Sequence, residues 1–126
     1  MQLATSRYQS ADLIVESGLA PVRITLGHPR FRLRYELAGT CRLLAPTREI
    51  FGLQPEEFSR SYVRLLDRRG VEQIRAALEE IGRETDAPGL VLLCFEDVLA
   101  GEFCHRRLFA DWWETKTGDA VPELGA

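Results

Sequence analysis

Residues 90–95 read Leu-Val-Leu-Leu-Cys-Phe, an unbroken apolar run between a turn at 86–89 and the acidic residues Glu96 and Asp97. A run this short that is apolar on both faces is typical of a central strand covered on both sides. It predicts a mainly parallel sheet with helices packed against it.

Helical patterns flank the run on both sides. Upstream, Pro55 is a favourable first helical residue, and the apolar spacing predicts a helix over 55–67. A second pattern begins after Gly70 and predicts a helix over 70–84. Downstream, residues 96–101 are expected to form a loop before a last helix over 103–116.

The first third of the chain shows strand signals. Residues 2–6 form a short strand candidate, and residues 22–26 alternate apolar with polar side chains up to the breaker cluster 27–29. Residues 40–45 are expected to form a third strand. Residues 9–20 are ambiguous between a helical turn and an extended segment.

These elements predict an α/β fold in a single domain over residues 1–126: a small sandwich with a mainly parallel sheet of about four or five strands flanked by helices. The length, with 45% apolar and 28% charged residues, fits one folded domain. No apolar run reaches the roughly 20 residues of a membrane span, and the N-terminus lacks a signal-peptide pattern. We therefore expect a cytoplasmic protein without a membrane partner.

Charge and cysteine content limit the function further. The net charge of -3 argues against a surface that binds polyanions generally, although a local basic pocket remains open. Three cysteines with irregular spacing make a poor disulfide framework and fit a reducing compartment.

The predicted topology indicates where a site would lie. In parallel sheets, ligands bind beyond the carboxyl ends of the strands. This rule brings side chains from several segments to one edge, where the start of the last helix joins them: Ser6, Arg7, His28, Arg30, Glu96, Cys104 and His105.

The most reactive segment is Cys104-His105-Arg106-Arg107, at the start of the last helix. A helix N-terminus and neighbouring cations favour a thiolate nucleophile, and they equally suit a phosphate or carboxylate without a covalent step. Two structural interpretations stay open: His105 lies on the apolar stripe of the helix, and Cys104 could be a small buried side chain. Arg106 is the candidate for a ligand contact, whereas Arg107 is expected to pair with Asp111.

Neither a metal nor another cofactor is expected. The spacing of Cys94, Cys104 and His105 matches no usual zinc pattern, and neighbouring helical side chains point about 100° apart. Cys94 is expected to be a core residue. Glu96 is a candidate general base or partner of His105, with a plain loop carboxylate as the alternative.

Residues 30–35, Arg-Phe-Arg-Leu-Arg-Tyr, alternate strictly and predict a strand with three arginines on one face. The favoured interpretation is an exposed edge strand protected from aggregation by charge. The alternative is a groove for phosphate or single-stranded nucleic acid with aromatic support.

The segment Leu92-Leu93-Cys94-Phe95-Glu96, followed by a short loop and Cys104-His105-Arg106, resembles the hallmark of the bacterial domain-of-unknown-function family 488. Thr5-Ser6-Arg7-Tyr8 and the segments 21–27 and 117–124 resemble its actinobacterial branch. The resemblance covers essentially the whole chain and implies a compact α/β fold in a bacterial or phage cytosol, with no assigned activity. The chain departs from the family pattern at the turn 27–29, where an aspartate-arginine-serine stretch is expected and this sequence has none.

Two functions are consistent with these features. The first is an enzyme or ligand-binding domain for a small phosphate-bearing or nucleotide-like ligand. Arg30 and Arg106 would hold the anion, with Cys104 as nucleophile or His105 as acid/base. The alternative is a non-catalytic nucleic-acid or protein-binding module that uses the arginine segment 30–34. A small anionic ligand is the favoured partner.

Overall fold

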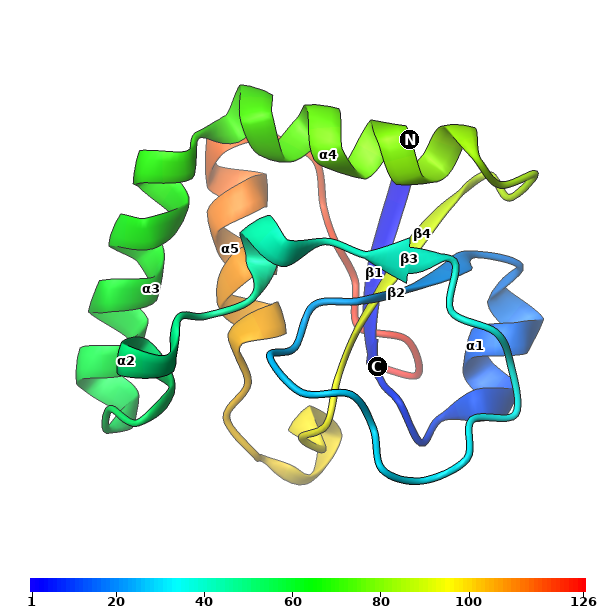
Figure 1. Cartoon of the computed structure of the whole chain (residues 1–126), viewed down its shortest axis with the longest axis horizontal. Coiled ribbons are helices and arrows are strands. Elements are labelled where there is room, and N and C mark those ends of the chain that lie inside the picture. Colours follow the sequence, from blue (N-terminus) through cyan, green and yellow to red (C-terminus); the bar gives the residue numbers. More distant parts are fainter.

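The computed structural model describes all residues, 1–126, and contains one four-stranded sheet in the order β1-β4-β2-β3. The strands are β1 (Gln2–Arg7), β4 (Gly89–Cys94), β2 (Ala20–Arg23) and β3 (Gly39–Thr40), and all neighbouring pairs are parallel (Figure 1). The predicted small α/β domain with a mainly parallel sheet is confirmed.

Strand β4 lies in the middle of the sheet, as its apolar sequence predicts. It pairs with β1 on one side and β2 on the other, and every one of its residues is buried. Leu90, Leu92 and Cys94 belong to the larger core cluster, while Val91 and Leu93 belong to the smaller one. The two faces of the strand therefore contribute to two separate cores.

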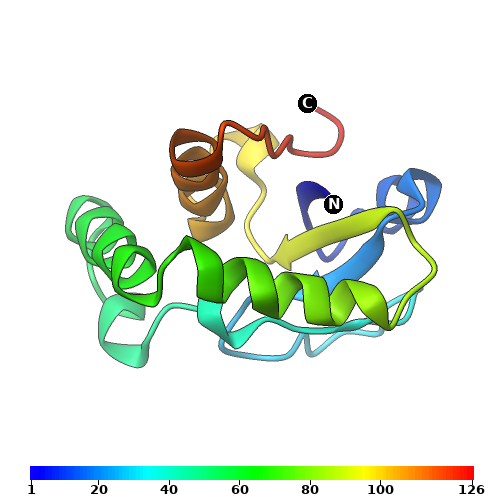
Figure 2. The same ribbon diagram turned by 90° about the horizontal axis from the view of Figure 1, so that it is seen from above.

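Three long helices build the larger core: α3 (Pro55–Arg69), α4 (Val71–Arg83) and α5 (His105–Thr117). They confirm the three predicted helices to within a few residues at each end. Helices α3 and α5 lie side by side (Figure 1), and the indole nitrogen of Trp112 donates a 2.9 Å hydrogen bond to Asp67 between them. Seen from above, α4 crosses in front of the strands (Figure 2).

Four short elements complete the fold. Helix α1 (Ala11–Ser17) resolves the ambiguous segment 9–20 and ends at Gly18, whose φ of 71° is in the left-handed region. The others are the single turns η1 (Arg42–Leu44) and η2 (Val98–Ala100) and helix α2 (Arg48–Phe51). None of the helices combines the length and apolar character needed to cross a membrane.

Three strand predictions need correction. The strand expected over 22–26 starts earlier and ends at Arg23, and the strand expected over 40–45 is reduced to two residues followed by the turn η1. Residues 30–35 form a loop and no strand. The edge of β2 that faces away from β4 is already paired, because the amides of Ala38 and Cys41 donate to the carbonyls of Pro21 and Arg23. Residues 30–35 therefore cannot pair with that edge.

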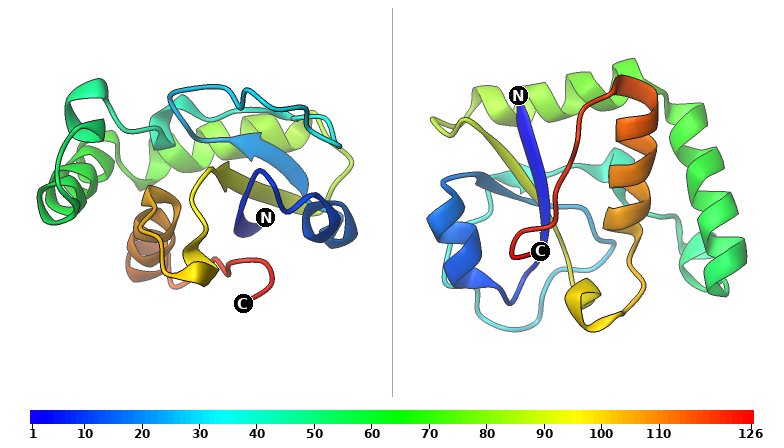
Figure 3. Two further views of the ribbon diagram at one scale, coloured as in Figure 1. Left: turned by 90° about the horizontal axis from the view of Figure 1, so that it is seen from below. Right: turned by 180° about the vertical axis from the view of Figure 1, so that it is seen from behind.

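The C-terminal segment runs alongside β1 (Figure 3). The Thr5 amide donates to the Pro122 carbonyl and the Leu124 amide donates to the Thr5 carbonyl, both at 2.8 Å. Residues after α5 therefore complete the edge of the sheet, close to the start of that helix.

Candidate active site

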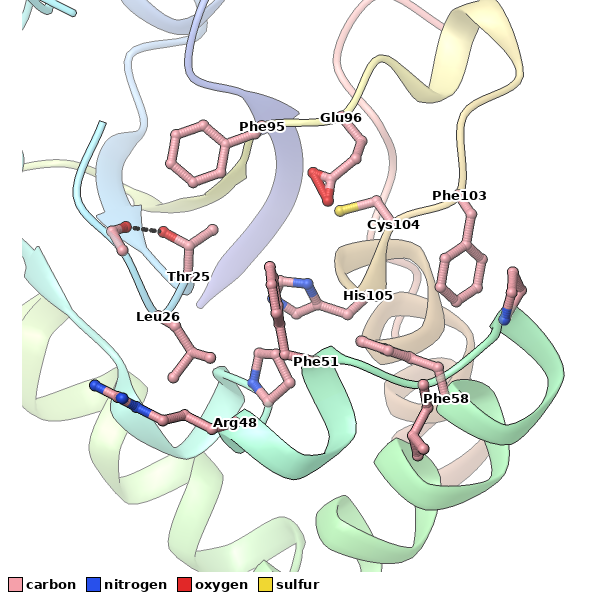
Figure 4. A pocket seen from close by; sticks show the side chains of 14 residues that line it. Thr25, Leu26, Arg48, Phe51, Phe58, Phe95, Glu96, Phe103, Cys104 and His105 are labelled. Carbon is pink, nitrogen blue, oxygen red and sulfur yellow. Dashed lines mark hydrogen bonds between the residues drawn. The ribbon is translucent and has the colours of Figure 1, made fainter. Parts of the chain in front are cut away.

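A cavity of about 730 Å³ opens beyond the carboxyl ends of β2 and β4, against the start of α5. Its walls are mainly apolar, and four phenylalanines supply the aromatic surface (Figure 4): Phe51, Phe58, Phe95 and Phe103. The polar lining side chains lie in separate places (Figure 4): Glu96, Cys104 and His105 are close together at the start of α5, and Thr25 and Arg48 lie apart from them. A cavity of this size accommodates a small organic ligand.

Cys104 is the N-cap residue of α5 and has an extended backbone, with φ -149° and ψ 140°. Its side chain lies on the pocket wall, and its thiol points toward the carboxyl group of Glu96 (Figure 4). Burial opposes ionisation of the thiol, but hydrogen bonds from Cys94 and His105 and the charges of His105 and Arg106 lower its pKa to about 4. The geometry therefore favours a thiolate at the edge of the pocket.

His105, the first residue of α5, is held in one orientation. Its Nε2 lies 2.8 Å from the Ile24 carbonyl oxygen, which can only accept, so Nε2 carries a proton. Nδ1 is left free for a second partner, and the Cys94 sulfur lies 3.7 Å from it and 3.6 Å from Nε2. It can accept a proton from a thiol or, once protonated, donate to the Cys104 thiolate.

Glu96 follows β4 and is half-buried beside Cys104. Its Oε2 atom is buried and has no hydrogen-bond partner. Burial and the negative charge of Cys104 raise the pKa of this carboxyl group. Glu96 is therefore suited to hold a proton that it can donate inside the pocket.

Arg106 does not face the pocket, which corrects its expected role as a ligand contact. Its side chain has 0% exposure, and its Nε and Nη2 donate to both carboxylate oxygens of Glu123 at 2.9 and 2.8 Å. The remaining Nη1 is buried without a partner. Its positive charge instead lowers the pKa of the Cys104 thiol.

The pair expected between Arg107 and Asp111 is also absent. Arg107 Nη1 donates to the Thr5 hydroxyl at 2.8 Å and to the Val121 carbonyl at 2.7 Å. Arg107 thus helps to hold the C-terminal segment against β1.

The other expected site residues lie outside the pocket lining. Ser6 is buried and donates weakly to the Arg7 carbonyl, while Arg7 pairs with Asp97 at 3.3 Å. His28 accepts from Arg23 at 2.7 Å, and Arg30 is exposed on the loop. Of the residues expected to converge, the structure brings only Glu96, Cys104 and His105 to the cavity.

Arg48 and the phenylalanine walls were missed by sequence reasoning. Arg48 belongs to the four-residue helix α2, and no local motif marks it as a site residue. Thr25 had a usable signal, since it lies just beyond β2 at the edge where ligands bind.

The donor atoms of Cys94, Cys104 and His105 all lie within 4.8 Å of one another, a set that could hold a soft metal ion. The angular argument against a shared metal fails because Cys104 is extended rather than helical. However, the Cys94 sulfur is almost equally far from Nδ1 and Nε2, at 3.7 and 3.6 Å. It does not lie along either nitrogen lone pair, so a shared metal would require a side chain to turn.

No protein-family model, curated protein or solved structure matches this chain.

Proposed function

We propose that this chain is an enzyme of the domain-of-unknown-function family 488 that attacks a small nucleotide-like ligand with the Cys104 thiolate. The observation that carries the proposal is the position of Cys104, whose thiol faces an aromatic cavity next to the Glu96 carboxyl group. The free state of all three cysteines supports a reducing, cytoplasmic setting.

The cavity wall supports a ligand with a planar ring. Phenylalanine rings bind flat aromatic groups by stacked and edge-on contacts, and four of them line this cavity. Arg48 is the only arginine or lysine in the lining, and its guanidinium group suits a phosphate or carboxylate. Arg48 thus takes the anion-binding role expected for Arg30 and Arg106.

The proposed reaction divides the work between two side chains. The Cys104 sulfur forms a bond to an electrophilic carbon of the ligand, and the electron pair displaced from that carbon moves to a neighbouring nitrogen or oxygen. Glu96 donates its proton to that atom. Hydrogen bonds from Cys94 and His105 and the positive charge of Arg106 stabilise the attacking thiolate before the bond forms.

A second candidate function uses the loop that contains the arginines. Arg30, Arg32 and Arg34 are exposed, as is Phe31, whose ring meets Phe95 edge-on at 6.5 Å. This surface suits a nucleic acid or an acidic protein. Binding of a single-stranded oligonucleotide tests this candidate. The binding should weaken with salt and should be lost when Arg30, Arg32 and Arg34 are all replaced by serine.

The pH dependence of thiol alkylation tests the nucleophile. Because the pKa of Cys104 is lowered to about 4, its iodoacetamide reaction should be nearly flat from about pH 6 to about pH 9 and fall as the pH approaches 4. Mass spectrometry of the labelled peptides would assign the rate to Cys104. The reactivity of an ordinary thiol would instead keep rising through pH 9.0, the pKa of an unperturbed thiol, where half of it is still protonated.

Cys41 provides the matched control. It is buried, and burial raises the pKa of its thiol, so it should react slowly. Cys41→Ser should leave the fast phase unchanged, whereas Cys104→Ser should abolish it. A Cys104 that remains unlabelled in the folded protein, or that titrates as an ordinary thiol, would contradict the proposal.

A further inference from the structure

The site contains a second thiol that the proposed reaction does not consume. Cys94 is the last residue of β4 and is fully buried, and its sulfur lies within 4.8 Å of the Cys104 sulfur. We propose that Cys94 and Cys104 form an oxidisable pair, in which Cys104 reacts with a hydroperoxide and Cys94 converts the product into an intramolecular disulfide. This rests on the proposed function only in requiring that Cys104 be a reachable nucleophile.

The two thiols differ in access, which assigns their order of reaction. Cys104 is only 3% exposed but lines the cavity, so its sulfur is the one that a small peroxide in the cavity meets, whereas Cys94 is fully buried and outside the lining. Peroxide therefore oxidises Cys104 first. Since the sulfurs are already neighbours, rotation of the side chains can bring them toward bonding distance.

The chemistry balances without a further oxidant. In the first step the Cys104 thiolate attacks one peroxide oxygen, the O–O bond breaks, and the departing oxygen takes a proton from Glu96. Cys104 becomes a sulfenic acid, and the peroxide is reduced to an alcohol or water. In the second step Cys94 attacks the Cys104 sulfur, the S–O bond breaks, and the hydroxyl group leaves as water with the proton from Cys94.

His105 is placed to move the proton in the second step. The bond from its Nε2–H to the Ile24 carbonyl fixes the ring and leaves Nδ1 3.7 Å from the Cys94 sulfur. The Cys94 sulfur does not lie along the Nδ1 lone pair, so its side chain must turn toward Nδ1 to pass on the proton that burial otherwise makes the thiol retain. The imidazole would thus activate Cys94 as well as stabilise the Cys104 thiolate.

Peptide mapping of the unaltered protein tests the pair directly. Trypsin releases residues 84–106 as one peptide that contains Cys94 and Cys104 but lacks Cys41. After hydrogen peroxide and alkylation, this peptide should be lighter by two hydrogen atoms than the reduced, unalkylated peptide and carry no alkyl group. Cleavage after Glu96 or Glu102 should leave its two halves joined until a reductant is added.

Variants at Cys94 test the order of the steps. Cys94→Ser and Cys94→Ala should stop at the Cys104 sulfenic acid, which dimedone captures, while Cys41→Ser should behave as the unaltered protein. The proposed disulfide would be wrong if peroxide converts Cys104 of the unaltered protein into a sulfenic or sulfinic acid while Cys94 can still be alkylated after denaturation. If rapid Cys104 alkylation persists in that case, only this inference fails; if it is lost too, the proposed nucleophile also fails.

Discussion

At the scale of single residues, Glu123 links the end of the chain to the reactive helix. Its carboxylate accepts both hydrogen bonds from Arg106 and a third, at 2.7 Å, from the Thr5 hydroxyl. A buried guanidinium is tolerated only when such partners replace its lost hydration. The C-terminal segment thereby holds the charge that lowers the pKa of Cys104.

Neutralising Glu123 should therefore destabilise the protein strongly. Glu123→Gln preserves the shape of the side chain but leaves Arg106 as an uncompensated buried charge, which should lower the free energy of unfolding by about 3 kcal/mol. Glu72→Gln is the matched control, because Glu72 forms an exposed pair with Arg75 and its loss should change that free energy by less than about 1 kcal/mol. Urea denaturation of both variants would measure the difference, and equal losses would contradict this role for Glu123.

The sequence correctly predicted those cavity residues whose place depends only on where a strand ends or a helix begins. Glu96 and Cys104 lie on either side of the loop between a strand end and a helix start, so both were expected at the cavity. Arg106 and Arg107 were misjudged because their directions depend on the C-terminal segment. The residues of that segment that they contact are 14 or more positions away along the chain. No sequence pattern near Arg106 or Arg107 therefore indicates that the segment packs against them.

At the scale of elements, periodicity predicted the helices well and the short strands poorly. The helices have repeated apolar positions that a core must bury, and α3, α4 and α5 appear near their expected bounds. The alternation in residues 30–35 is real, since Leu33 and Tyr35 pack against the smaller core while the arginines are exposed. It produces no strand because β3 already pairs with the edge that the segment would need.

The pairing of β1 with β4 depends on a glycine at the start of the central strand. Gly89 pairs with Gln2, and an added Cβ would lie 1.9 Å from the Gln2 carbonyl oxygen. Gly89→Ala must therefore displace the strand, and we expect the free energy of unfolding to fall by more than about 2 kcal/mol. Gly52→Ala, at a position with open space around the Cβ, should stay within about 0.5 kcal/mol of the parent in the same urea titration. Similar stability for the two variants would contradict this requirement.

At the scale of the whole molecule, the cavity exists only because distant segments meet. The ends of β2 and β4, the short helix α2 and the start of α5 each contribute one part of its wall. Folding therefore creates the environment that ionises Cys104, and it does so by placing His105 and Arg106 beside a thiol that is neutral in the unfolded chain. The stability of the fold and the charge of the site are thermodynamically linked.

This linkage predicts how stability depends on pH. The pKa of Cys104 is 9.0 for an ordinary thiol and about 4 in the folded protein, so between these values the unfolded chain binds more protons. The contribution of Cys104 to the free energy of unfolding is complete above pH 9, decreases as the pH falls, and is lost through pH 4. Glu96 acts in the opposite direction, because its raised pKa means that the folded state binds the extra proton.

Comparison of the parent protein with Cys104→Ser measures the Cys104 contribution together with its interaction with Glu96, because the Cys104 charge also raises the pKa of Glu96. The difference in the free energy of unfolding between them should grow from about pH 5 to about pH 8, with a slope of at most about 1.4 kcal/mol per pH unit. Urea denaturation at a series of pH values, under reducing conditions that keep the thiols free, would measure this slope. A difference that stays constant over the whole range would mean that folding does not ionise Cys104, and the thiolate would lose its thermodynamic basis.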